Sequence, residues 1–339
     1  MISRRTALCT ALQRTAALTT VAAAAALLGA PSLASAQTAE AWPTRPVRLI
    51  VPYAAGGFAD TRARLIAEQL GKVLGQPVIV DNRGGAGGVT GTDAIAKATD
   101  GHTFGFGSPG PLVTNPMLMK KMPYDAKTAI KPIILIEEAP LFLTTALNQP
   151  FKNVQELVAF AKAKPGELTF GSSGVGGAHH LSGELLAYQT HTQMTHVPYK
   201  GGSLAASDLM GGHLAMMFEM GYSALPSIKA KKINALAVSS KKRLAVLPDV
   251  PTLDEAGIKG FESYNWLGMI APASTPKSVI TQLNRAVNKA LETDTALRDM
   301  IEGSGGMIVG GTPEAYGKFM DAERAKWAPV IKAAKISLD

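Results

Sequence analysis

The stretch VRLIVPYAAGGFAD at residues 47–60 combines a strand, a flexible turn and the start of a helix. Residues 47–53 are mostly β-branched or apolar, which is typical of a buried strand. Gly56 and Gly57 then supply a tight turn. Beyond it, apolar residues recur at helical spacing, at Leu65, Ile66, Leu70, Val73 and Leu74. A strand that passes through a glycine turn into a helix predicts the first part of a parallel βαβ unit.

The same alternation of strands and helices continues to the end of the chain. Further strands are expected at 77–80, 102–108, 132–138, 141–147, 168–173, 194–199, 213–219, 233–240 and 264–270. Helices are expected at 91–98, 153–164, 177–190, 203–210 and 222–231, and after Pro276 and Pro313. About ten strands are too many for one open sheet. We therefore predict two α/β lobes with mostly parallel sheets flanked by helices, lobe 1 being residues 37–138 plus 264–339 and lobe 2 residues 139–263.

Residues 1–36 have the pattern of a cleavable export signal. Arg4, Arg5 and Arg14 precede or flank an uncharged apolar run at 16–30, and Ala34-Ser35-Ala36 fits a signal-peptidase site. The paired arginines are compatible with either the Sec or the twin-arginine route. Cleavage would remove the one cysteine, Cys9, and lower the net charge by three, from +8 to +5. We expect a periplasmic protein without disulfides.

Several kinds of chemistry are excluded by missing motifs. The sequence contains no phosphate-binding P-loop, no HExxH zinc motif and no dinucleotide-type glycine spacing. The adjacent His179 and His180 point to different sides of a helix, so we expect solvated or capped side chains rather than metal ligands. The basic residues are spread along the chain, which argues against a nucleic-acid surface. We predict no metal, no cofactor, no catalytic residue and a monomer.

An exported serine hydrolase is the alternative that the sequence leaves open. The stretch at 171–175, GSSGV, loosely resembles a nucleophile elbow, with Ser173 as the nucleophile and His180 or His196 as the base. Val175 occupies the position at which that motif requires glycine. A second alternative is a sensor that presents its ligand-bound form to a signalling receptor.

Four turns rich in small residues follow predicted strands, at 53–60, 107–110, 171–177 and 198–203. In open α/β sheets, ligands bind outside the carboxyl ends of the strands. Helix N-termini carry unpaired N–H groups and partial positive charge, and therefore suit anions. The turns predict a container for a small carboxylate. Several candidate residues could instead have a purely structural role. Asp60 and Ser203 could be helix caps, Tyr53, Phe58 and Tyr199 could be core residues, and Glu219 could form an ion pair.

The mature chain resembles the Bug-type solute-binding receptors of tripartite tricarboxylate transporters over roughly residues 42–335. The resemblance rests on motifs in a fixed order: WPTRPVRLIVPYAAGG at 42–57, VDNRGGAGG at 80–88, DGHT at 100–103, PYD at 123–125, GSSGVG at 171–176, HLSGE at 180–184, HVPYKG at 196–201 and PDVPT at 248–252. It implies a periplasmic-binding-protein, or Venus flytrap, fold that closes around a carboxylate and delivers it to membrane permease subunits.

The resemblance also implies which residues hold the ligand. In the family, backbone amides of the first turn and of the Gly-Ser turn hold carboxylate groups, often through water, which corresponds here to Tyr53, Ala55, Gly56, Phe58, Asp60, Ser172, Ser173 and Gly176. Ser108, Tyr199 and Glu219 complete the predicted ligand-binding set. The sequence departs from many relatives at 107–111 (GSPGP) and at Phe218-Glu219. Both departures lie where ligand selectivity would be set.

Overall fold

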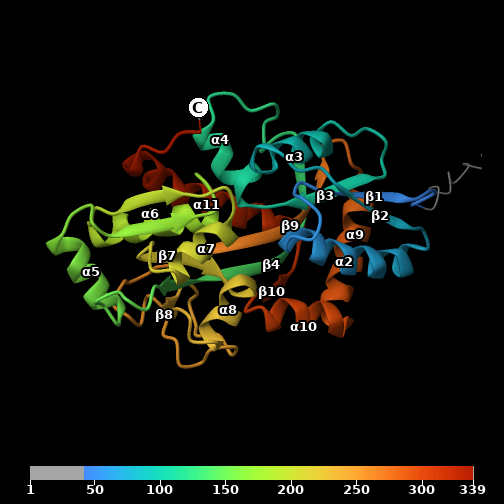
Figure 1. Ribbon diagram of the computed structural model, residues 1–339. Helices are drawn as coiled ribbons and strands as arrows, with labels where there is room; N and C mark the ends of the chain where they lie inside the picture. The colour runs from blue at the N-terminus through green and yellow to red at the C-terminus, as the bar shows by residue number, and fades with distance from the viewer. Residues whose placement is uncertain (1–41, 339) are drawn as a thin grey trace, which may run out of the picture. The chain divides into compact units, whose positions relative to one another are not determined.

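One long strand, β4 (Ile130–Thr145), connects the two parts of the sheet in the computed structural model, which describes residues 42–338 (Figure 1). The sequence predicts two strands here, at 132–138 and 141–147, but Ala139 and Pro140 continue the same strand and pair with β9. Nearly every residue of β4 is buried, because other strands pair with it and helices cover it. The predicted signal at 1–36 lies outside the described residues.

The first half-sheet contains the residues of β4 up to Pro140 together with five other strands. These are β1 (Val47–Val51), β2 (Val78–Asn82), β3 (Thr103–Gly107), β9 (Tyr264–Pro272) and β10 (Met307–Gly310). The strands β2, β1 and β3 are mutually parallel, as the sequence predicts. Antiparallel pairings join β3 to β9, β9 to β4, and β4 to β10. The strand β10 was not among the sequence expectations, because it is short and follows a glycine-rich turn.

The second half-sheet contains the residues of β4 from Leu141 onward and four strands from the middle of the chain. These are β5 (Thr169–Ser172), β6 (Thr195–Pro198), β7 (Met216–Met220) and β8 (Asn234–Val238). Parallel pairings join β6 to β5 and β5 to β7, whereas β7 and β8 are antiparallel to β4. The parallel pairs that the sequence predicts therefore lie in the outer parts of the sheet. The middle is antiparallel because β9 runs opposite to both β3 and β4, and β4 runs opposite to β7 and β8.

Helices cover both half-sheets. Their bounds are α2 (Phe58–Leu74), η1 (Ala86–Gly88), α3 (Val89–Ala96), η2 (Gly110–Thr114), α4 (Asn115–Leu118), α5 (Val154–Ala163), α6 (Ala178–Thr190), α7 (Gly202–Met210), α8 (Gly221–Lys229), α9 (Lys277–Thr293), α10 (Thr295–Gly303) and α11 (Pro313–Ala334). The helix α11 packs on both β4 and α6. No helix among residues 42–338 combines the length and apolarity needed to cross a membrane.

A buried carboxylate anchors α11 to the sheet. The indole N–H groups of Trp266 in β9 and Trp327 in α11 both donate to Oε2 of Glu323, at 3.2 and 3.1 Å. Trp266 and Trp327 are almost fully buried, so each needs an acceptor for its indole N–H. Glu323 satisfies both of them, and this fixes the position of Trp266 in the sheet.

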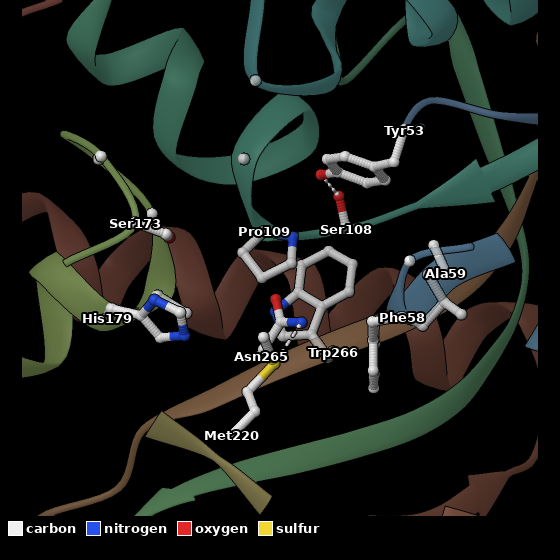
Figure 2. A pocket seen from close by; sticks show the side chains of 18 of the residues that line it. Tyr53, Phe58, Ala59, Ser108, Pro109, Ser173, His179, Met220, Asn265 and Trp266 are labelled. Atoms are coloured by element: carbon white, nitrogen blue, oxygen red, sulfur yellow. Dashed lines mark hydrogen bonds between the residues drawn. The ribbon is translucent and has the colours of Figure 1, made fainter. Parts of the chain in front are cut away.

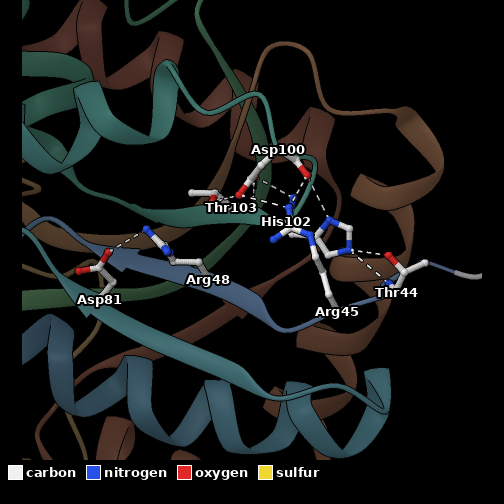
Figure 3. A network of polar contacts seen from close by, with 7 residues as sticks. All are labelled: Thr44, Arg45, Arg48, Asp81, Asp100, His102 and Thr103. Carbon is white, nitrogen blue, oxygen red and sulfur yellow. Dashed lines mark hydrogen bonds and ion pairs between the residues drawn. The ribbon is translucent and has the colours of Figure 1, made fainter.

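A polar network at the amino ends of β1 and β3 anchors the first half-sheet (Figure 3). Asp100 accepts hydrogen bonds from the backbone N–H groups of His102 and Thr103 and from the Thr103 hydroxyl, at 2.9–3.0 Å. These bonds outweigh burial and lower the pKa of Asp100. The Asp100–Thr103 motif therefore shapes the end of the sheet that faces away from the carboxyl ends of the parallel strands.

Buried serines join the chain where it passes between the half-sheets. The Ser239 hydroxyl accepts from the N–H of Leu141 at 2.8 Å and donates to the carbonyl of Ser263. The Ser263 hydroxyl in turn contacts the Ser182 hydroxyl at 2.6 Å. All three serines are fully buried. The segments near 138–140 and 262–264, where the sequence predicts the crossings between lobes, thus lie side by side.

Candidate functional site

A cavity of about 500 Å³ lies at the carboxyl ends of β1, β3 and β5. The loops that follow these three strands surround it, and β9 forms one wall (Figure 2). Its lining is made of Tyr53, Ala54, Ala55, Gly57, Phe58, Ala59, Gly87, Ser108, Pro109, Gly110, Asn115, Ser173, Gly174, Val175, Gly176, Gly177, Ala178, His179, Met220, Asn265, Trp266 and Leu267. Three of the four predicted turns contribute to the lining. The fourth, at 198–203, does not.

The first loop ends at the N-terminus of α2. The N-cap residue is Gly57, and no side chain caps the helix there. Asp60 is not a cap for the first helical amides: its Oδ2 accepts from the N–H of Gly56 at 2.8 Å and from Nε of Arg64 at 3.0 Å. Although burial opposes them, these bonds lower the pKa of Asp60. Asp60 therefore shapes the turn as an ionised carboxylate, while Phe58 and Ala59, the first residues of α2, line the cavity.

The second loop is held against the first by a short hydrogen bond. The hydroxyls of Tyr53 and Ser108 lie 2.5 Å apart (Figure 2), and both residues line the cavity. Burial raises the pKa of Tyr53, so its phenol stays protonated and can donate. A Cβ on Gly88 would lie 3.1 Å from the Tyr53 oxygen, which explains the glycine there. The two loops form one wall with neutral hydroxyl groups.

The third loop is built on a cluster of two histidines. Ser172 Oγ lies 2.6 Å from Nε2 of His196, and the N–H of Gly176 donates to Nδ1 of His180 at 3.0 Å. The two imidazoles stack with their centroids 3.7 Å apart. Burial and the neighbouring His180 lower the pKa of His196 to about 4, so His196 is neutral at pH 7. Ser172, rather than the cavity-lining Ser173, contacts a histidine, which gives the hydrolase alternative no support.

The loop ends at the N-terminus of α6, which is the second helix N-terminus at the cavity. Gly177 is the N-cap residue and no side chain caps this helix. The first amides of a helix have no partner within the helix. Ala178 and His179, the first residues of α6, line the cavity from the second half-sheet, as the first residues of α2 do from the first.

The cavity lining carries no formal charge among the described residues. It contains no lysine, arginine, aspartate or glutamate, and burial lowers the pKa of His179 to about 4, which keeps that imidazole neutral. Each helix N-terminus is equivalent to roughly half a positive charge. The two N-termini thus make the cavity electropositive without a cationic side chain. Within the described part of the chain, no group of three histidine, cysteine or acidic side chains has the arrangement of a metal site.

The wall from β9 was missed by the sequence analysis. Asn265 and Trp266 line it, and the amide of Asn265 donates to the sulfur of Met220 at 3.1 Å (Figure 2). The strand β7 ends at Met220 and β9 begins at Tyr264, both beside the cavity. The position of Asn265 and Trp266 next to the predicted crossing near 262–264 is the signal that could have identified them. The apolar patterning of 264–270 indicated a buried strand and concealed its role in the lining.

Six of the eleven predicted ligand-binding residues line the cavity: Tyr53, Ala55, Phe58, Ser108, Ser173 and Gly176. Five do not, namely Gly56, Asp60, Ser172, Tyr199 and Glu219. The N–H groups of Gly56 and Gly176 are both used within the chain, by Asp60 and His180. The Tyr199 hydroxyl donates to Asp208 at 2.7 Å in the second half-sheet.

Glu219 is buried beside the cavity wall rather than in it. Its side chain is on the face of β7 opposite to that of Met220, because side chains alternate along a strand. Burial raises the pKa of Glu219 to about 7, and its Oε1 has no hydrogen-bond partner. No ion pair forms at Glu219 among the described residues. The buried ion pair nearby joins Arg62 of α2 to Glu137 of β4, at 3.0 Å.

An α/β fold whose strand-end loops surround a cavity without charged side chains, made electropositive by two helix N-termini, is the arrangement expected of a solute-binding protein. The model of the tripartite tricarboxylate transporter family receptor matches residues 62–336. Protein BugT of Bordetella pertussis is 36% identical over 302 residues, which cover 88% of this chain and 92% of BugT. This chain therefore belongs to the tripartite tricarboxylate transporter receptor family.

Solved structures confirm the periplasmic-binding-protein fold. The R. palustris protein Rpa4515, solved with adipate, superimposes with a TM-score of 0.77 at 36% identity, covering 87% of this chain and 99% of that chain. MatC from Rhodopseudomonas palustris, solved with bound malate, gives a TM-score of 0.74 at 30% identity, covering 86% and 100%. Members of the family are solute-binding receptors, and these two contain carboxylates.

Proposed function

We propose that this chain is a periplasmic receptor that captures a small organic carboxylate in the cavity and delivers it to the membrane permease subunits of a tripartite tricarboxylate transporter. The adipate and malate in two relatives support a carboxylate as the ligand class. The receptor acts as a monomer, is exported by the signal at 1–36, and performs no chemistry on its ligand.

One observation carries this proposal: two uncapped helix N-termini, from α2 and α6, border one cavity that lacks charged side chains. A carboxylate there would accept hydrogen bonds from main-chain N–H groups that have no partner within their own helices. Because the two helices belong to different half-sheets, a ligand held by both would favour a closed arrangement of the lobes. The proposed lobes are residues 37–138 plus 264–339 and residues 139–263.

The test is a thermal-unfolding screen of the purified mature protein against monocarboxylates, dicarboxylates, tricarboxylates, amino acids and aromatic acids. Micromolar affinity corresponds to about −8 kcal/mol of binding free energy. At a ligand concentration a hundredfold above Kd, binding stabilises the folded state by about 2.7 kcal/mol, which raises Tm by about 5 °C for a chain of this size. If no acid in the panel raises Tm, the proposal is wrong.

The transport role and the sensor alternative differ in the partner of the receptor, which is a membrane permease in the first case and a signalling receptor in the second. We expect deletion of the associated permease genes to abolish ligand uptake by cells while the purified receptor still binds. Uptake that persists without the permease, together with loss of a transcriptional response when the receptor is deleted, would support the sensor instead.

A further inference from the structure

His179 is a buried polar side chain at the cavity whose ring nitrogens have no partner. It is the second residue of α6, is only 7% exposed, and lines the cavity. Neither Nδ1 nor Nε2 makes a hydrogen bond. Figure 2 shows the ring extending from α6 toward Asn265 and Met220 on the far wall. Among the described residues, no other cavity-lining side chain contains a buried polar atom without a partner.

An unsatisfied buried imidazole indicates a missing partner. Buried donors and acceptors in native proteins are almost always paired, and exceptions call for an explanation such as a ligand or water. A neutral imidazole has one N–H donor and one acceptor nitrogen. The helix N-terminus can satisfy a carboxylate, but it cannot donate to and accept from this ring. With the carboxylate held by the helix N-terminus, His179 is free to pair with a second polar group of the ligand.

The surroundings of His179 limit the charge of that second group. The ring lies at the positive end of α6, where an ammonium group would be repelled. No acidic side chain lines the cavity to compensate such a cation. A hydroxyl group suits the site, because it can donate to the acceptor nitrogen or accept from the N–H without adding charge.

The absence of a side chain at Gly202 leaves space beside the His179 ring. A Cβ on Gly202 would lie 3.4 Å from Cε1 and 4.0 Å from Nδ1 of His179, so glycine leaves room on that side. Because both nitrogens are covered, the exposed 7% belongs to other atoms. A half-turn about χ2, a broad torsion in histidine, exchanges each ring nitrogen with a carbon. Either orientation keeps the ring in place at the cavity edge.

We propose that His179 is a specificity-determining residue that hydrogen-bonds a hydroxyl group of the ligand, so that the receptor prefers hydroxy acids to the corresponding unsubstituted acids. This inference rests on the proposed function and names the substrate class for the same cavity. The apolar walls from Phe58 and Trp266 then face the carbon skeleton between the acid and the hydroxyl group.

Calorimetric titration with matched pairs of acids tests this inference. The pairs are succinate and malate, phenylacetate and mandelate, and hexanoate and 6-hydroxyhexanoate, each differing by one hydroxyl group. We expect the wild-type protein to bind the hydroxylated member of at least one pair about two- to tenfold more tightly, the range of one net hydrogen bond. His179→Phe should remove this preference while changing the affinity for the unsubstituted acid by less than about twofold.

Further variants separate recognition from packing. His179→Gln keeps a donor and an acceptor and should retain part of the hydroxyl preference, whereas His179→Leu, a smaller apolar replacement, should lose it as His179→Phe does. His213→Phe, at an exposed histidine outside the cavity, is the matched control and should bind like the wild type.

Two outcomes overturn the inference and remain distinguishable. If acids bind but the wild type shows no hydroxyl preference, or if His179→Phe and His179→Leu keep the preference, His179 is a packing residue and the proposed function stands. If no acid binds to the wild type at all, the proposed function is overturned and the inference with it.

Discussion

Single residues at the edge of the cavity have environments that sequence patterns do not reveal. The sequence indicated that Glu219 lies at the end of a strand and that His179 and His180 lie on a helix. It could not indicate burial without a partner, because that depends on segments far apart in the chain. His179 was expected to be solvated or capped, but it is buried with neither nitrogen satisfied. Tyr53, Ser108 and Ser173 lie in the turns singled out in the sequence, with Tyr53 and Ser173 also implied by the family resemblance, and all three line the cavity.

The buried carboxyl of Glu219 predicts a pH-dependent stability. Its pKa is about 7 in the folded protein and close to 4.5 in the unfolded chain. The folded state then binds the extra proton between these values, so stability falls as the pH rises from about 4.5 to about 7. Glu219→Gln lacks this titrating group, so its stability should not show this loss. The free energy of unfolding of the variant minus that of the wild type should therefore increase by on the order of 3 kcal/mol over this interval. Urea unfolding of both proteins at pH 5 and pH 8 measures this difference. A difference between variant and wild type that is the same at pH 5 and pH 8 would contradict the prediction.

Gly176 predicts a residue-scale effect on binding. Its φ is +77°, and a Cβ there would meet the side chain of Leu118. Gly176→Ala should cost about 1–2 kcal/mol of stability and should weaken carboxylate binding, because the loop carrying Ser173 must move. Gly75→Ala is the control, since Gly75 has a similar φ of +69° at the end of α2 with open space around it. Equal Kd values for the two variants would contradict the expected role of this loop.

At the scale of elements, periodicity predicted most strands and helices, and pairing direction was harder to predict. The alternation of strand and helix gave β1, β2 and β3 as parallel neighbours, which the structure confirms. It could not show that β9 pairs with β4, because the paired residues are more than 120 positions apart in the sequence and antiparallel pairing needs no connecting helix. The short helix α10 and the short strand β10 were not predicted either. Their stability comes from contacts with α2, α9 and β4, which their own sequence pattern does not reveal.

The helix N-termini predict the effect of an added charge. Ala178→Asp places a carboxylate in the first turn of α6, at the position proposed for the ligand's acid group. The fold should be unaffected or slightly stabilised, by up to about 1 kcal/mol, because an acid at a helix N-terminus is favourable. Ligand affinity should fall at least about tenfold, since two like charges at short range repel strongly.

Ser223→Asp provides the matched control for that substitution. Ser223 is exposed in the first turn of α8, outside the cavity lining, and the change in charge is the same. Its ligand affinity should stay at the wild-type value in calorimetry. If both variants bind the acid as the wild type does, α6 does not hold the carboxylate.

At the scale of the whole molecule, one aromatic contact joins helices that pack on different half-sheets. Phe58 of α2 and Tyr222 of α8 stack with ring centroids 5.8 Å apart, and Arg62 lies 4.2 Å above the Phe58 ring. Tyr222 does not line the cavity and is 48% exposed. Tyr222 therefore stabilises the arrangement of the two halves from outside the cavity lining, through its contact with Phe58.

Removing this contact should weaken binding indirectly. An aromatic pair contributes about 0.5–1.5 kcal/mol, so Tyr222→Ala should raise Kd about two- to tenfold by disfavouring the closed form. Tyr188→Ala is the control, because Tyr188 is 45% exposed on α6 and lies outside the cavity. Small-angle scattering should show a larger radius of gyration for the unliganded Tyr222→Ala protein. Identical Kd values for both variants would rule out this coupling. The lobe boundaries themselves stay a prediction.

The continuity of β4 also determines the order in which the sheet can assemble. The second half-sheet uses residues between Leu141 and Val238 only. The first half-sheet needs β9 and β10, which are synthesised last. Contacts between residues far apart in the sequence form slowly. The second half-sheet can therefore pair before β9 is available to join β3 to β4 in the first half-sheet. A chain truncated before residue 264 would lack both β9 and β10, and would therefore leave the edge of β3 and both edges of the first part of β4 unpaired and prone to aggregation.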